Sequence, residues 1–262
     1  MQVVDAARTT RTRLKRNEEV ERKLRRMTIL VGMIGSDGIV LAADQLMVRP
    51  ATNVKEYDDR GRVRKIEYLQ GHGVAYAGVG DQYTRRVESA LSIRLDEGQF
   101  DFENIRRSLE RTADDTIKDE RAKNEQAYSP QEDPGIPDLP RDLLVVFHGP
   151  QVDQRQMWSL AIDPVRSTAS RVEGCCIRGA IGNLARFFGE YYETNIPVAT
   201  LKRLAAHIVL SAQRFESGMI GGLDVSLFDD AGFHRLDEEA KESLRARYRE
   251  LNDLVRTQLF EA

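Results

Sequence analysis

The sequence predicts an α/β (α+β) layer sandwich in which helices lie outside a pair of sheets. Three observations support this fold class. β-rich runs begin abruptly at residue 28, two helical patterns follow them, and the chain then continues with strands, two more helices, a strand and a final helix. This order is typical of sheets that bury one face against each other and the other face against helices.

Composition limits the class of protein. The 262 residues are 41% hydrophobic and 31% charged, which is typical of a soluble globular chain, and the length suits one large domain. No apolar run approaches the roughly 18–20 residues that cross a bilayer. The charged N-terminus contains no apolar signal segment. These features exclude a membrane span and a signal peptide, and they favour the cytoplasm.

Residues 1–27 form a charged N-terminal extension ahead of a predicted domain at 28–262. The first 26 residues hold nine Lys or Arg and four Asp or Glu, with few apolar residues. We interpret them as a solvated helix or a disordered arm. Basic arms also bind nucleic acid, but this one lacks interleaved aromatic residues, which argues against that role. A pro-segment that is removed, or an over-long gene start ahead of Met27, are further interpretations.

Two strand pairs are predicted in the first third of the chain. Residues 28–44 contain two β-rich runs joined at 35–38 by an Asp-Gly hairpin signal, so two buried antiparallel strands are expected. Residues 65–81 contain a second pair, broken by glycines at 71–73. A turn is expected at 60–61, in the polar stretch between the two pairs.

Helical patterns follow, and the chain then alternates strands and helices. Apolar spacing of three and four residues predicts surface helices at 81–97 and 102–125. Four prolines predict an exposed loop at 128–141. The remaining predicted elements are strands at 142–148, 155–162 and about 168–181, helices at 183–194 and 198–216, a strand at 223–228 and a long charged helix at 237–259.

The cysteines and histidines do not indicate a metal site. Cys175 and Cys176 are adjacent and are predicted to point to opposite faces of a strand, so we expect reduced core residues rather than a disulfide. The four histidines are scattered, without HExxH or Cys/His spacing. We therefore expect no metal and no cofactor.

Residues at the front of the domain stand in an informative order. They are Thr28, a glycine four residues later, the run DGIVLAAD ending at Asp44, a Lys-Ile pair at Lys65, and AYAGVGD, which contains Gly78. Taken singly, each has an ordinary explanation as a strand start, an ion pair or a turn. Together they resemble the proteasome β-subunit superfamily of N-terminal-nucleophile (Ntn) hydrolases, of the bacterial proteasome-related type. The resemblance covers 28–81 well and implies a four-layer αββα sandwich of two antiparallel sheets flanked by helices.

The resemblance also implies the site residues. Thr28 takes the position of the catalytic N-terminal threonine, sixteen residues before Asp44 as in the family. Lys65 takes the position of the family lysine, although the stretch between Asp44 and Lys65 is longer than usual. Gly78 takes the position of the glycine whose backbone N–H serves the oxyanion hole.

Two later positions depart from the family pattern. The turn before the helix at 183–194 agrees in its glycine, but Asn183 replaces a serine and is expected to hydrogen-bond near the threonine amine. Farther on, 221–222 matches a Gly-Gly pair. Glu216 or Ser217 stands in for the aspartate and serine that precede this pair in the family, or nothing does.

The implied chemistry depends on the nitrogen of Thr28. A threonine hydroxyl is a weak nucleophile and needs a base, which a free α-amino group on the same residue provides. The pKa of such an amine is ordinarily near 8. A buried Lys65 ammonium lowers it, while Asp44 holds Lys65 and offsets its burial. The scheme requires a Thr28 that carries no peptide bond on its nitrogen. Methionine aminopeptidase would liberate that amine if translation starts at Met27.

The leading hypothesis is a threonine-type endopeptidase subunit that hydrolyses peptide bonds in unfolded proteins or peptides. The resemblance implies assembly into a homo-oligomeric ring, with an ATPase activator as a candidate partner, and no membrane or nucleic-acid partner is expected. Two alternatives stay open. One is a non-catalytic structural subunit of such a ring, in which Thr28 is never liberated. The other is a small-molecule amidohydrolase on the same fold.

Overall fold

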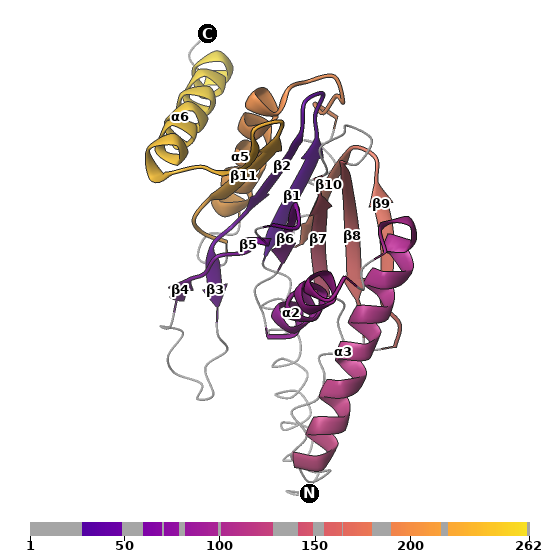
Figure 1. Cartoon of the computed structure of the whole chain (residues 1–262). Coiled ribbons are helices and arrows are strands. Elements are labelled where there is room, and N and C mark those ends of the chain that lie inside the picture. The colour runs from indigo at the N-terminus through magenta and orange to yellow at the C-terminus, as the bar shows by residue number, and fades with distance from the viewer. Residues whose placement is uncertain are drawn as a thin grey trace, which may run out of the picture.

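Two antiparallel sheets packed face to face form the centre of the molecule, and helices cover the outer face of each sheet (Figure 1). The predicted four-layer αββα sandwich is therefore confirmed. The computed structural model of the chain describes residues 28–48, 60–69, 71–78, 82–98, 101–127, 141–148, 155–163, 165–179, 190–215 and 220–260.

The first sheet contains both strands of the predicted N-terminal hairpin. The turn between them closes with a hydrogen bond from the Gly35 N–H to the Gly38 carbonyl, at 2.8 Å. Every residue of the second hairpin strand is buried, as expected for a central strand. The strand order is β10-β1-β2-β11-β12. The strands are β1 (Ile29–Ile34), β2 (Ile39–Ala43), β10 (Cys175–Gly179), β11 (Asp224–Asp229) and β12 (Gly232–Arg235).

The second sheet contains the other predicted strand pair, broken at the glycine turn as expected. Its order follows the sequence, β5-β6-β7-β8-β9, so β5 and β9 are the edge strands. The strands are β5 (Ile66–Leu69), β6 (Val74–Gly78), β7 (Arg141–Phe147), β8 (Gln156–Ile162) and β9 (Thr168–Val172).

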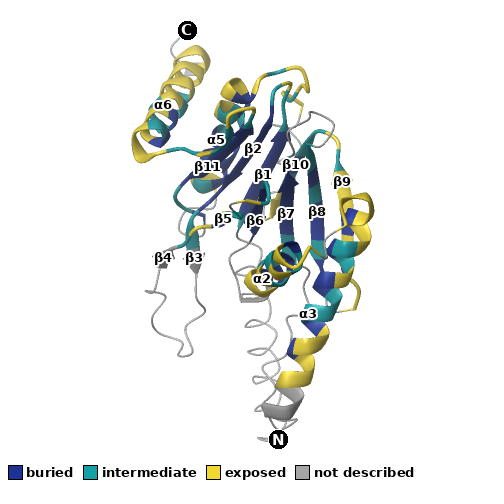
Figure 2. Cartoon of the chain, in the orientation of Figure 1, coloured by how far each residue is buried: buried dark blue, intermediate teal, exposed yellow. Residues whose placement is uncertain are grey.

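Each outer face of the sandwich carries helices. The helices on the second sheet are α2 (Gln82–Asp96) and α3 (Ile105–Ala127), preceded by the 3-10 helix η1 (Phe102–Asn104), and those on the side of the first sheet are α5 (Val198–Phe215) and α6 (Glu238–Phe260). α5 lies on the sheet because Leu201, Ala205, Ile208 and Ala212 form one buried stripe. The outer helix faces are exposed (Figure 2). None of the described helices is long and apolar enough to cross a membrane.

Apolar side chains fill the three spaces between the four layers. Strand alternation explains how one strand serves two of them: Leu30 of β1 belongs to the cluster between the sheets, whereas Val31 belongs to the cluster under α5. The adjacent cysteines behave in the same way. Cys176 lies in the cluster between the sheets, Cys175 packs against the cluster under α5, and both thiols are free.

The structure corrects three predictions of secondary structure. The single strand expected at 168–181 is two strands, β9 and β10, which belong to different sheets because the chain crosses between them at 173–174. The turn expected at 60–61 lies instead within β4 (Arg60–Arg62), which pairs with β3 (Leu46–Val48). The short edge strand β12 was not predicted, because its four residues carry no alternating apolar pattern.

Several predicted segments lie outside the described residues. These are the N-terminal extension at 1–27, the proline-rich loop up to residue 140, and residues 183–189 of the expected helix. The last part of that helix, 190–194, is a turn in the structure. The Tyr192 hydroxyl donates to the Ile34 carbonyl at 2.5 Å, which ties this turn to β1.

Candidate active site

Three of the predicted site residues meet at one end of the space between the sheets. Thr28 immediately precedes β1, Asp44 immediately follows β2, and Lys65 immediately precedes β5. β1 and β2 are antiparallel neighbours, so the start of one and the end of the other lie at the same edge of the sheet. Lys65 reaches that edge from the facing sheet.

Lys65 bridges the threonine and the aspartate. Its Nζ donates to Thr28 Oγ1 at 2.9 Å and to Asp44 Oδ1 at 2.8 Å. The Asp44 carboxylate also accepts two backbone hydrogen bonds, from the Ile29 N–H at 3.0 Å and the Leu46 N–H at 3.2 Å. Both carboxylate oxygens are therefore engaged, and the ammonium is fixed against the threonine hydroxyl.

The charges of this group are buried. Asp44 is 0% exposed and Lys65 is 3% exposed, whereas Thr28 is partly exposed. Burial lowers the pKa of Lys65 below its usual 10.5, and the charge of Asp44 opposes that shift. Burial likewise raises the pKa of Asp44, and the ammonium with its hydrogen bond opposes it. Each group thus offsets part of the other's desolvation, and Thr28 is the one residue of the trio that is partly exposed.

Gly78 also lies next to Lys65, but its N–H has a partner. It donates to the Lys65 carbonyl at 2.9 Å, as part of the join between β5 and β6. A Cβ at Gly78 would lie 2.7 Å from Glu88 Oε1 and 3.0 Å from Leu143 Cδ1, so a larger residue would require the ends of these two side chains to move. An oxyanion role for Gly78 requires this N–H to be shared with, or released from, the Lys65 carbonyl.

The remaining predicted site residues, Asn183 and Ser217, lie outside the described residues, as does Glu216. Within the described ranges, no group of three or more His, Cys, Asp or Glu side chains is arranged to hold a metal ion.

Gly179 is a site residue that the sequence interpretation missed. It pairs with Ile29 across β10 and β1 and has a φ of +111°. A Cβ at this position would lie 1.6 Å from the Thr28 carbonyl oxygen. Both the backbone angle and the close approach therefore require glycine. A lone glycine at the end of a strand pattern is the signal that would have identified it.

A cavity of about 230 Å³ adjoins the Lys65 side of the site. Its walls carry charges of both signs, and it shares Lys65 with the trio. The lining residues are Arg64, Lys65, Glu67, Arg85, Glu88 and Ser89.

No family model and no curated protein sequence matches this chain. Solved structures do match its fold. The Anbu (Gly-1) mutant from Hyphomicrobium sp. strain MC1 is 11% identical, with a TM-score of 0.67 over 90% of this chain and 97% of that one. Anbu, the ancestral beta-subunit, from Yersinia bercovieri is 16% identical, with a TM-score of 0.63 over 88% and 97%. Anbu from Pseudomonas aeruginosa, described as a helical assembly, is 13% identical, with a TM-score of 0.64 over 89% and 96%.

Proposed function

We propose that this chain, which shares its fold with Anbu beta-subunits, is a proteasome-like threonine-type endopeptidase subunit with Thr28 as its N-terminal nucleophile. The substrates would be peptide bonds in unfolded proteins or peptides. The observation that carries the proposal is the position of Lys65 Nζ, within 2.9 Å of Thr28 Oγ1 and within 2.8 Å of Asp44 Oδ1. A structural ion pair would not need the ammonium to reach a threonine hydroxyl as well.

The first step is activation of the hydroxyl. Once the Met27–Thr28 peptide bond is gone, the α-amine of Thr28 is a base on the same residue as the hydroxyl, and the positive charge of Lys65 favours its neutral form. The amine takes the hydroxyl proton while Oγ1 attacks the peptide carbonyl. The hydrogen bond from Lys65 stabilises the negative charge that develops on Oγ1. Asp44 keeps the ammonium in place during this step.

The second step is collapse of the tetrahedral intermediate. Its oxyanion needs backbone donors, and one such donor contributes on the order of 3 kcal/mol. We assign this role to the Gly78 N–H, shared with the Lys65 carbonyl. The leaving amine takes the proton from the Thr28 ammonium, and an ester remains on Oγ1. Water then attacks the ester, with the amine again as base. Asn183 stays a proposed hydrogen-bond partner near the amine, and Glu216 or Ser217 stays a proposed stand-in for the family's aspartate and serine.

Assembly is part of the proposal. We expect a homo-oligomeric ring or related assembly in the cytoplasm, in which access to an enclosed chamber limits substrates to extended chains. The Anbu complex of Pseudomonas aeruginosa forms a helical assembly, which supports self-association of this fold. An ATPase that unfolds substrates is the proposed partner.

The test has two parts. The chain is expressed with Met27 as its initiator, its N-terminal residue is sequenced, and turnover of fluorogenic peptides is measured for the wild type, Thr28→Ala and Thr168→Ala. Thr168 is an exposed threonine on the edge strand β9 and serves as the matched control. We expect a free Thr28, turnover in the wild type and control, and none in Thr28→Ala.

The other outcomes identify the alternatives. A Thr28 that stays blocked in its native host, with no turnover, indicates the non-catalytic subunit. A free Thr28 in a monomer or dimer that cleaves small amides but no peptides indicates the amidohydrolase. Turnover that survives Thr28→Ala removes the proposed nucleophile altogether.

A further inference from the structure

The strand that follows Lys65 has one side open. Within the plane of a sheet, successive backbone carbonyls of a strand point alternately towards its two lateral sides, where neighbouring strands would lie. The Lys65 carbonyl accepts from Gly78 and so points towards β6. The next carbonyl, that of Ile66, therefore points to the other side, where β5, an edge strand, has no neighbouring strand among the described residues. Ile66 is 0% exposed, so this carbonyl needs a partner from elsewhere in the protein.

Arg235 supplies that partner. It is the last residue of β12, in the facing sheet, and its Nη2 donates to the Ile66 carbonyl. Its guanidinium carbon also lies 5.9 Å from the centre of the Phe233 ring. The side chain thus joins the two sheets one residue away from Lys65, between segments separated by 169 positions in the sequence.

Asp224 provides the opposite charge. It is 1% exposed and lies on β11, two residues before Ser226, the register partner of Arg235. Burial raises the pKa of Asp224, and the charge of Arg235 is the largest of the effects that oppose this shift. Neither carboxylate oxygen has a hydrogen-bond partner among the residues that the structure describes. Asp224 is therefore held by charge rather than by direct hydrogen bonds.

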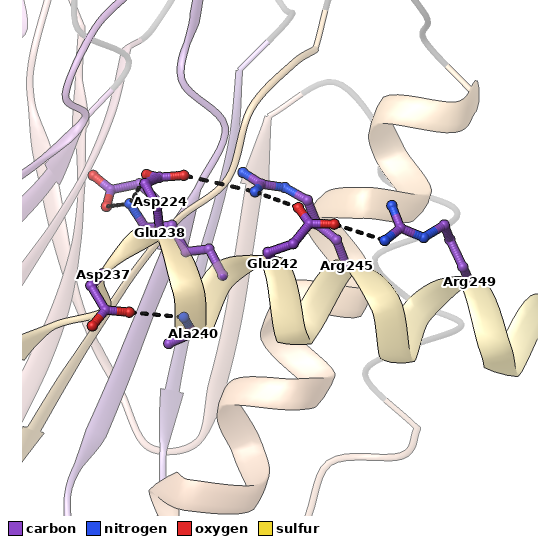
Figure 3. Close-up of polar contacts among 8 residues, drawn as sticks. Asp224, Asp237, Glu238, Ala240, Glu242, Arg245 and Arg249 are labelled. Atoms are coloured by element: carbon purple, nitrogen blue, oxygen red, sulfur yellow. Dashed lines mark hydrogen bonds and ion pairs between the residues drawn. The ribbon is translucent and has the colours of Figure 1, made fainter.

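The nearby lysine of α6 is shared with another acid. Lys241 Nζ lies 3.9 Å from Asp224 Oδ1 but donates to Glu238 Oε1 at 3.0 Å. Glu238 lies beside Asp224 at the start of the helix (Figure 3). From there, ion pairs continue along the helix through Arg245, Glu242 and Arg249 (Figure 3). Asp224 therefore has a distant ion pair with Lys241, and Arg235 is a further positive charge that acts on it.

We propose that Arg235 is a positioning residue for the candidate active site. Its guanidinium, balanced by the buried Asp224, fixes the open edge of β5 and so keeps the Lys65 ammonium between Thr28 and Asp44. Without it, the Ile66 carbonyl loses its hydrogen-bond donor and Asp224 loses one of its counter-charges, so β5 is no longer tied to the facing sheet next to Lys65. The expected effect on peptide turnover rests on the proposed function, whereas the expected effect on the position of Lys65 does not.

The test follows the environment of Lys65 in the full-length chain. An acylating reagent is added to the wild type and to three variants, Arg235→Met, Arg235→Lys and Arg155→Met. The rate of Lys65 modification is measured by peptide mass spectrometry. Arg155 is the matched control because it pairs with Asp230 at the other end of the β11–β12 hairpin. We expect Lys65 modification to be roughly tenfold faster in Arg235→Met, intermediate in Arg235→Lys, and close to wild type in Arg155→Met.

A kinetic measurement on the same variants, expressed with Met27 as the initiator so that the Thr28 amine is free, accompanies the labelling. If the protein cleaves peptides, Arg235→Met should lower kcat about tenfold and leave KM within about twofold, because it disturbs a group that acts on the nucleophile rather than substrate binding. Faster labelling in a protein whose wild type has no turnover supports the inference and counts against the proposed function. Lys65 labelling that is unchanged in both Arg235 variants overturns the inference, whatever their melting temperatures. If Arg235→Met does not fold, the rate of Lys65 labelling in Arg235→Lys tests the inference instead: a faster rate than in the wild type supports it, and an unchanged rate overturns it.

Discussion

Replacing Asp44 by asparagine measures how strongly the buried pair is coupled. The amide keeps the shape of the side chain and an acceptor for the Ile29 N–H, but it leaves the Lys65 ammonium, 3% exposed, without a counter-charge. Breaking one side of a buried pair typically costs about 3–5 kcal/mol. A chain of this size melts about 2–4 °C lower per kcal/mol. We therefore expect Asp44→Asn to melt roughly 6–20 °C below the wild type.

The assay is calorimetry or circular dichroism with two reference variants. Asp115→Asn removes a half-exposed partner of Arg94 and should change stability by less than about 0.5 kcal/mol. The double variant Asp44→Asn/Lys65→Met should recover most of the loss, because no buried charge remains. A loss of less than about 1 kcal/mol in Asp44→Asn, or no recovery in the double variant, would show that the two buried charges are not strongly coupled.

The pH dependence of Asp44→Asn gives a second check on the same pair. Burial already lowers the pKa of Lys65 below 10.5, and loss of the carboxylate lowers it further. The unfolded chain then binds more protons than the folded one between that lowered pKa and 10.5, so stability rises with pH in this window. Asp44→Asn should accordingly recover part of its loss as the pH is raised towards 10.

Three further predictions concern other positions. Gly179→Ala should abolish peptide turnover in a protein whose Thr28 is free, since its Cβ would fall 1.6 Å from the Thr28 carbonyl oxygen; turnover near wild type would contradict the close approach. Burial raises the pKa of Cys175 to about 12 from 9.0, so stability is fully present below pH 9 and falls by roughly 1.4 kcal/mol per pH unit above it. Urea midpoints of Cys175→Ala should decline less steeply over that range. Asp237→Ala removes the side chain that accepts from the Ala240 N–H at the start of α6 and should cost about 1 kcal/mol in urea unfolding.

The front of the domain could be predicted from sequence because the residues that determine its structure are close together in the chain. The hairpin at 28–44 has its own turn signal and two apolar runs, and antiparallel pairing alone brings Thr28 and Asp44 to one edge. Lys65 sits immediately before a recognisable strand. The contact of its ammonium with both residues follows once the two sheets pack face to face.

The rest of the site depends on partners that are distant in sequence. Gly179 becomes important only because β10 pairs with β1, and the pattern at 168–181 did not reveal that the chain changes sheets before β10. Arg235 lies on a short edge strand without alternation and reaches Ile66 of the other sheet. No local pattern encodes such a contact. Asp224, a charged residue opening an apolar strand, was the one available hint.

The most direct test of the account is the covalent reaction of a peptide epoxyketone, a probe whose ring closure needs a hydroxyl and a free amine on one residue. The probe is added to protein that begins at Thr28 and to protein that retains residues 1–27, and intact mass and peptide mapping locate the adduct. We predict one adduct per chain on Thr28 of the first protein and none on the second. An unmodified Thr28 with a free amine in the assembled protein would contradict its assignment as the nucleophile.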